Sequence, residues 1–406
     1  MEERRFFDQL ADLAIRVGTN LQPGQELVVL GDVEHSPLVR AVMEAGWRAD
    51  ASDVYCAYRE PYDRLMLGRY GEGEQLGRST FLQLALVDHL AQGQSAVVIV
   101  DGEAEPDLCN EVAPERMARI VPVEWRRRQS ELLARQGVAW VLVPFPTAAW
   151  ASRVFGEPDL RRLRDAIGRA MRLDEPDPVA AWQTHVGTLA DRAQSLTVRG
   201  YDGLRFRGPE TDLFIGLLPN AQWAGGVMRT SWGQPHVPNL PTEEVATTPD
   251  FRRTEGIVTT TLPFADDGAY VPQASFRFEG GRLVSASATE GEGWLRQMLA
   301  TDDGASRLAE VALVPAQNRL SDLGLTFFHR LFDENISSHM AFGDSYTEGV
   351  PGSERLSAAE REATGMSTSL VHYDFMIGGS NVDVLGIRKD GTEEVIMAHG
   401  DWVLAA

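Results

Sequence analysis

Apolar and polar positions in the first half of the chain follow two alternating patterns. Phe6, Leu10, Leu13 and Val17 recur at three- and four-residue spacing, which predicts an amphipathic helix. Short apolar, β-branched runs predict strands, and helical patterns lie between them. The expected strands span 25–30, 53–58, 95–100 and 138–143, and the expected helices span 36–46, 77–92 and 113–135. Strands spaced by helices favour a mostly parallel sheet with both faces covered.

The pattern changes in the second half of the chain. Residues 158–195 have helical spacing and many arginines, so we expect one or two connecting helices there. Beyond Leu196 short runs alternate with period two, which indicates strands. We therefore predict an α/β N-terminal domain over residues 1–190 that ends in the connecting helices, and a strand-rich α+β metal-binding domain over residues 191–406.

Composition narrows the class of protein. The chain has 406 residues with 43% hydrophobic and 24% charged, and no apolar run approaches the roughly 20 residues that a membrane-spanning helix needs. The N-terminal residues do not resemble a signal peptide, so we expect a cytoplasmic protein. A formal charge of −21 disfavours nucleic acid and anionic membranes as partners. With only two cysteines, any metal must be held by oxygen and nitrogen ligands.

Carboxylates and histidines that suit a metal site gather in the last third of the chain. His372 and Asp374 lie two residues apart in an apolar run, so on a strand they share a face. They are either metal ligands or an acid–base pair, or they form a cross-strand hydrogen bond that has only a structural role. Glu310 interrupts the apolar run 308–314, and a buried carboxylate there needs an arginine or a metal ion as its partner.

Three further residues, taken one at a time, indicate a metal site less clearly. Glu243 and Glu244 are adjacent, so in an extended chain only one of them faces a given site; a turn or helix start is the alternative. His339 follows a polar loop, where a surface or capping role is common.

The segment 343–349 resembles the Gly-Asp-Ser block of the GDSL esterases, in which the serine, here Ser345, is the nucleophile. In those enzymes an Asp-x-x-His pair follows more than a hundred residues later. Here 61 residues follow Ser345, and none of them forms that pair. A serine esterase therefore stays a minor alternative.

Taken together, the acidic and histidine positions resemble the M29 family of metallo-aminopeptidases. The matching stretches are 237–245, 308–314, 334–339 and 369–378. The resemblance implies that Glu244, Glu310, His339, His372 and Asp374 are divalent-metal ligands and that Tyr346 is the active-site tyrosine. It also implies a homodimer with an enclosed active-site cavity. Segment 343–349 is more acidic and richer in glycine than the usual family segment.

Three carboxylates and two imidazoles exceed the three protein ligands that one hydrolytic zinc usually takes, so two divalent ions would share them. We expect zinc, cobalt or manganese. Such a pair can activate water and anchor a free amine, which predicts an aminopeptidase that acts on peptides with a free N-terminus. Glu243 is the first candidate for the general base, and Tyr346 is expected to stabilise the oxyanion. A non-catalytic relative with a structural metal site is the second alternative.

Overall fold

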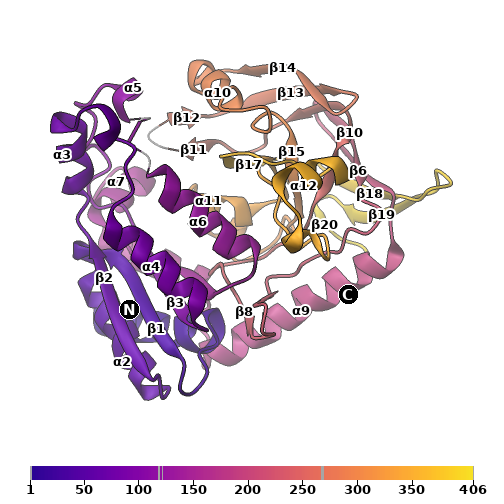
Figure 1. Ribbon diagram of the computed structural model, residues 1–406. Helices are drawn as coiled ribbons and strands as arrows, with labels where there is room; N and C mark the ends of the chain where they lie inside the picture. Colours follow the sequence, from indigo (N-terminus) through magenta and orange to yellow (C-terminus); the bar gives the residue numbers. More distant parts are fainter. Residues whose placement is uncertain (1, 118, 121, 267–268, 406) are drawn as a thin grey trace. The chain divides into compact units, whose positions relative to one another are not determined.

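The computed structural model describes residues 2–405 except 118, 121 and 267–268 (Figure 1). Its chain forms two compact units. The first unit comprises Met1–Gln183 and Val227–Leu240, and the second comprises Thr184–Gly226 and Pro241–Ala406. The predicted boundary at residue 190 lies within helix α9 (Pro178–Arg199), and the division into folding domains stays a prediction.

The first unit is built on a parallel four-stranded sheet with the order β2-β1-β3-β4. Its strands are β1 (Glu26–Asp32), β2 (Asp53–Arg59), β3 (Ala96–Asp101) and β4 (Ala139–Pro144). All four apolar runs of the first half thus form strands, and the predicted parallel α/β architecture is confirmed.

Helices cover both faces of this sheet, as strands with apolar residues on both sides require. Val28 of β1 packs in one cluster with Val87 and Leu132, which lie on α4 and α6. On the other face Gly46 of α2 closely approaches the side chain of Leu27. The helices are α1 (Glu3–Leu13), α2 (Ser36–Arg48), α3 (Tyr62–Tyr70), α4 (Phe81–Gln92), α5 (Pro114–Met117), α6 (Val123–Ala134), α7 (Ala148–Phe155) and α8 (Leu160–Ala170).

The helical pattern over 113–135 forms two helices, α5 and α6. Pro114 is the first residue of α5, and Pro122 directly precedes α6. Proline lacks a backbone N–H and suits a helix start, so Pro122 favours a new helix over continuation of the old one.

A segment from the middle of the chain completes the first unit. Residues 227–240 contain the short strands β7 (Met228–Arg229) and β8 (Pro235–His236). The side chain of Gln234 donates to the carbonyl of Thr19 at 2.9 Å. The Val237 N–H donates to Gly18 at 2.7 Å, and the Leu142 N–H donates to Pro238 at 2.7 Å. These bonds join the segment to residues more than 90 positions earlier in the chain.

The second unit contains an antiparallel eight-stranded sheet with the order β14-β13-β10-β6-β5-β18-β19-β20. The strands are β5 (Gly203–Gly208), β6 (Thr211–Leu217), β10 (Pro249–Thr259), β13 (Ala274–Glu279), β14 (Arg282–Ala288), β18 (Asp383–Ile387), β19 (Glu393–Ala398) and β20 (Asp401–Trp402). The predicted strand-rich second half is therefore confirmed.

A smaller antiparallel sheet, which we call the site sheet, has the order β17-β16-β15-β9. Its strands are β9 (Val245–Thr247), β15 (Leu308–Leu313), β16 (His339–Gly343) and β17 (His372–Met376). Phe342 of β16 and Phe375 of β17 stack on each other with ring centroids 4.9 Å apart, and both contact Phe276 of β13. This aromatic core holds one face of the site sheet, and alternation directs the intervening residues to the other face.

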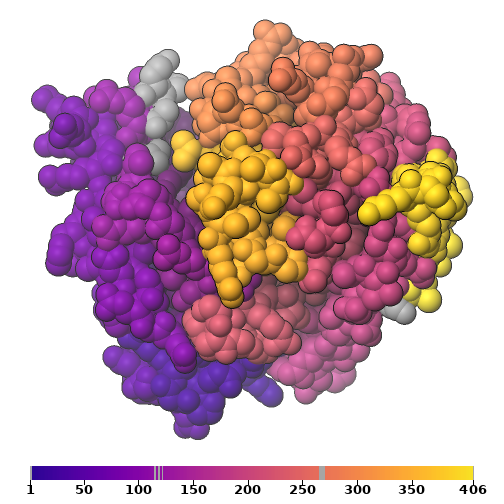
Figure 2. Space-filling view, turned by 45° about the vertical axis from the view of Figure 1, so that its right-hand side comes forward, coloured from indigo at the N-terminus to yellow at the C-terminus, as the bar shows by residue number. Residues whose placement is uncertain are grey.

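Short helices and a hairpin complete the second unit. The helices are α10 (Glu292–Leu299), α11 (Arg330–Asp333) and α12 (Ala358–Thr364), and the hairpin strands are β11 (Phe264–Asp266) and β12 (Ala269–Val271). Figure 2 shows the gold residues around α12 on the surface of this unit. Among the described residues, no helix combines the length and apolar character that crossing a membrane requires.

Candidate metal centre

The site sheet brings four of the predicted ligands together through its register. Glu310 of β15 and Asp374 of β17 both pair with Ala341 of the central strand β16. His372 pairs with Gly343, which has φ +114° and whose added Cβ would lie 1.9 Å from the Val371 carbonyl. Because the central positions are small, the side chains of the flanking strands can meet above them.

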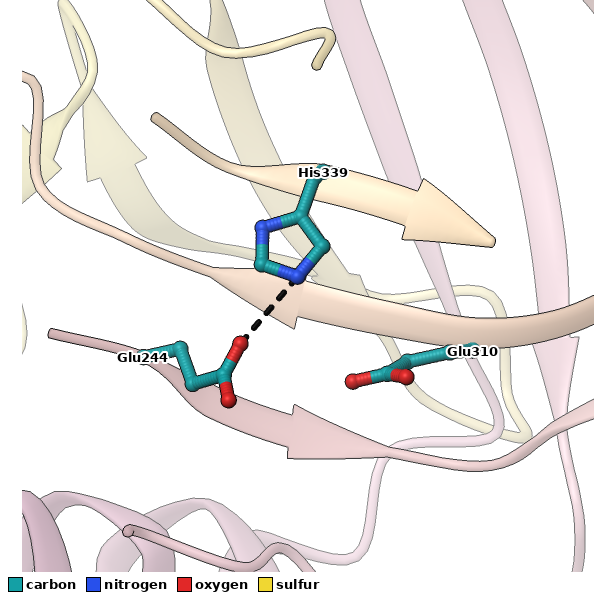
Figure 3. Close-up of side chains that lie close together, drawn as sticks. All are labelled: Glu244, Glu310 and His339. Carbon is teal, nitrogen blue, oxygen red and sulfur yellow. Dashed lines mark ion pairs between the residues drawn. The ribbon is translucent and has the colours of Figure 1, made fainter. Parts of the chain in front are cut away.

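The fifth predicted ligand, Glu244, directly precedes β9. Its carboxylate lies 3.1 Å from Nε2 of His339, and Figure 3 shows the Glu310 carboxylate directed towards the same space. Ligand atoms of Glu244, Glu310 and His339 lie within 4.8 Å of one another, and so do those of Glu310, His372 and Asp374. We call these the first and second triads. Glu310 belongs to both, and all five predicted ligands therefore lie in one cluster.

Both histidines present Nε2 to the carboxylates. Nε2 of His372 is 3.2 Å from Glu310 and 3.3 Å from Asp374. Nδ1 of His372 lies 2.8 Å from the Asp344 carbonyl, and Nδ1 of His339 lies 3.3 Å from the Ser337 carbonyl. A carbonyl at Nδ1 favours a proton on that atom, which leaves Nε2 with its lone pair free for a cation.

Burial and like charges shift the pKa values of the cluster. Burial raises the pKa of Glu310, and the charges of Glu244 and Asp374 raise it further against the opposing effect of His372. Burial lowers the pKa of His339, but the hydrogen bond and charge of Glu244 outweigh it and raise that pKa to about 10. The carboxylates of the cluster therefore favour positive charge at His339.

Glu334 is a further acidic residue beside the cluster, and it is not among the five predicted ligands. It is 8% exposed. Burial and the charges of Asp374 and Glu244 raise its pKa well above the ordinary value. Glu334 begins the stretch 334–339 that resembles the M29 family, but it lies on the short helical turn Glu334–Ile336, where too few residues follow for a periodic pattern to indicate which way a side chain faces.

Tyr346 and Glu243 flank the cluster differently. The ring of Tyr346 lies against the ring of His372, with centroids 4.5 Å apart, and 53% of the residue is exposed. Glu243 is buried, and its carboxylate lies 3.3 Å from Nε2 of His185. Among the described residues, neither triad includes Glu243.

Ser345 is not placed as an esterase nucleophile. Its side chain is 1% exposed, and its hydroxyl oxygen accepts the backbone N–H of Ser367 at 3.0 Å. The hydroxyl joins two loop segments and does not face solvent, so the esterase alternative is not favoured.

The donor set suits divalent cations. Carboxylate oxygens and imidazole nitrogens are the ligands of mixed hydrolytic sites. Four buried or half-buried carboxylates surround two histidines here, and bound cations would offset the cost of burying their charge. Each triad could therefore hold a metal ion, and the two triads share the carboxylate of Glu310.

The comparisons with known proteins agree with this class. Residues 4–402 match the family described as thermophilic metalloprotease (M29). The chain is 38% identical to aminopeptidase T of Thermus thermophilus over 99% of both chains, and 39% identical to aminopeptidase T of Thermus aquaticus over 98% of both. It is 35% identical to aminopeptidase 2 of Geobacillus stearothermophilus over 97% of both.

A solved structure shows the same fold. It is wild-type AmpT from Thermus thermophilus, with a TM-score of 0.90 at 37% identity, covering 98% of this chain and 99% of that one. The chain belongs to the M29 family of metalloproteases. The predicted membership and the predicted metallo-aminopeptidase class are confirmed.

Proposed function

We propose that the two triads hold two divalent cations and that Glu310 bridges them. The observation that carries this proposal is the membership of Glu310 in both triads. When bound, the ions would supply Lewis acidity to the scissile carbonyl and to the attacking water. Glu334 is a candidate sixth ligand, because it is buried and the charges of Asp374 and Glu244 raise its pKa.

The chain's own residues would orient the reactants. The carbonyls of Asp344 and Ser337 hold the two imidazole rings in place through Nδ1. We assign to Tyr346 a hydrogen bond to the developing oxyanion, since its ring packs on His372 beside the cluster. Glu243 remains the candidate that accepts the proton of the attacking water.

The substrates would be peptides with a free N-terminus. An α-amine is drawn to a site rich in carboxylates, and a blocked N-terminus removes that attraction. The relatives named aminopeptidase T and aminopeptidase 2 support this substrate class.

Zinc, cobalt or manganese as the metal, a homodimer and a cytoplasmic location are further parts of the proposal. The mixed oxygen and nitrogen donors accept each of these three metals. The homodimer rests on the family resemblance, and the location rests on the character of the sequence.

The test is metal stoichiometry measured beside activity. We expect about two divalent ions per chain and release of the N-terminal residue from short peptides, but not from the same peptides after N-acetylation. Metal uptake without any release would favour the alternative of a non-catalytic relative. Equal release from acetylated peptides would contradict the aminopeptidase proposal.

A further inference from the structure

Four of the five predicted ligands are held by strand pairing, but Glu244 is not. Glu310, His339 and the pair His372 and Asp374 lie on β15, β16 and β17. Residues 242–244 form irregular backbone before β9 begins at Val245. A ligand on irregular backbone keeps its position only if other groups bind that backbone, since no strand ladder reaches it.

Asn335 supplies such a bond from the interior of the second unit. Its side chain is 0% exposed, and its Oδ1 accepts the Glu243 N–H at 2.7 Å. Its Nδ2 donates to the Leu331 carbonyl at 2.9 Å. The reverse orientation of the amide would set a donor against the Glu243 N–H, so these two bonds fix the side chain in one orientation.

The position of Asn335 joins two ligand segments. It lies four residues before His339, on the short helical turn Glu334–Ile336. Glu243, whose N–H it binds, directly precedes Glu244, and the Glu244 carboxylate lies 3.1 Å from Nε2 of His339. One buried amide therefore joins the segment that carries Glu244 to the segment that carries His339.

His185 on helix α9 contacts the same irregular segment. Its Nε2 lies 2.9 Å from the Thr242 carbonyl and 3.3 Å from the Glu243 carboxylate. No sequence pattern indicates a role for His185, because these two partners lie 57 and 58 residues further along the chain. Together Asn335 and His185 bind both residues that directly precede Glu244.

We propose that Asn335 is a positioning residue that holds Glu244 against His339 and that His185 is a second support of the same segment. The inference rests on the proposed function, because it concerns ligands of the proposed ions. Removing a group that hydrogen-bonds to a metal-binding residue and holds it in place typically weakens metal binding by about 10–100-fold.

The experiment titrates Co²⁺ into chelator-treated protein and follows its visible absorption, which reports coordination geometry. Asn335→Ala is expected to weaken Co²⁺ binding by about 10–100-fold and to change the absorption spectrum. The rate constant kcat at saturating Co²⁺ should fall by a smaller factor than the affinity. His185→Ala, at a side chain that is 16% exposed, should weaken Co²⁺ binding less than Asn335→Ala does.

Asn318→Ala is the matched control. Asn318 is also buried, and it also binds backbone groups on both sides of its amide, accepting from Leu320 and donating to Pro315. Its side chain also donates to the Ile336 carbonyl at 3.0 Å, but among the described residues it makes no hydrogen bond to 242–245. This variant should lose stability but keep the Co²⁺ affinity of the wild-type protein.

Three outcomes would count against these assignments. Wild-type Co²⁺ affinity in Asn335→Ala would overturn the positioning role of Asn335 alone. If that variant does not fold, His185→Ala decides, and wild-type affinity in it would overturn the support of the segment. Failure of the wild-type protein to take up Co²⁺ would overturn the proposed function, and this inference with it.

Discussion

Glu310 is the residue on which the proposed metal site most depends, because both triads contain it. It is 7% exposed and lies in a strand whose other residues are apolar. A carboxylate in such a place destabilises the fold unless positive charge compensates it. Selection for stability alone would favour an apolar residue here, so the carboxylate indicates a function.

Glu310→Gln should remove activity and lower metal content. Glutamine keeps the shape of the side chain but cannot bridge two cations as a carboxylate does. We expect the rate of N-terminal residue release to fall by more than about 100-fold. This loss is larger than the one that follows when a residue hydrogen-bonded to a metal ligand is removed. Metal content per chain and the initial rate on a dipeptide measure the two effects.

Asp333→Asn is the control for this prediction. Asp333 is a buried carboxylate of the same unit, but it binds the backbone N–H groups of Phe327 and His329 and belongs to neither triad. Turnover and metal content in Glu310→Gln equal to those of Asp333→Asn would contradict the bridging role.

Members of the site could be predicted from the sequence only where a local pattern of apolar and polar positions indicated them. Glu310 was selected because a charge interrupts an apolar run, and His372 with Asp374 because period two places them on one face. The roles of Asn335 and His185 could not be predicted, since the backbone groups of residues 242 and 243 that they bind are 57 to 92 residues away and only the folded chain brings them close. Local patterns carry no record of such contacts.

At the scale of elements, the central strand β16 makes room for the cluster with two small residues. Ala341 lies between Glu310 and Asp374 in the register, and Gly343 lies opposite His372. The residues that alternate with them, Met340 and Phe342, are buried in the core. Because side chains alternate along the strand, one face of β16 packs in the core and the other faces the predicted ligands.

Ala341→Leu should close the space above β16. The larger side chain would stand between the two carboxylates, so we expect loss of metal binding with the fold retained. Metal content after dialysis and circular dichroism check the two parts. Met340→Leu, a volume-conserving change on the core face of the same strand, should leave metal content unchanged; retained metal in Ala341→Leu would speak against this reading of the register.

The pairing of strands could not be predicted in the way that their existence was. The sequence indicated each apolar run of the first half, but the order β17-β16-β15-β9 joins strands whose loops differ widely in length. Register depends on contacts across the sheet and on turn geometry, which a single-chain pattern does not contain. The helical pattern over 113–135 forms two helices for a local reason, the proline at 122.

At the scale of the whole molecule, metal binding should be linked to stability. Ligands that bind only the folded state add about 2.7 kcal/mol at a hundredfold excess over the dissociation constant. For a unit of this size that corresponds to a rise in Tm of roughly 5–10 °C. Thermal unfolding with and without a chelator measures it, and Glu310→Gln should show no chelator effect. An identical Tm in both conditions for the wild-type protein would contradict the site.

The first unit should lose stability in acid through His236. This side chain is 2% exposed, and burial lowers its pKa from 6.5 to about 4. Below pH 6.5 the unfolded chain therefore binds a proton that the folded chain does not, so stability falls as the pH falls. The full loss by pH 4 is about 3 kcal/mol.

Urea unfolding of the wild-type protein and of His236→Gln across this pH range tests the assignment. Glutamine does not titrate, so its curve should be flatter between pH 6.5 and 4 by about 3 kcal/mol. Parallel curves for the two proteins would show that His236 is not the responsible group.

The return of residues 227–240 to the first unit has a consequence for biosynthesis. A nascent chain that has emerged only as far as Gln183 lacks the partners of Gly18, Thr19 and Leu142. At 5–20 residues per second, the ribosome needs roughly 3–11 s more to reach Leu240. During that interval the first unit lacks residues 227–240 and cannot complete its fold. Truncated fragments that stop near residue 183 should therefore be targets for chaperones and proteases.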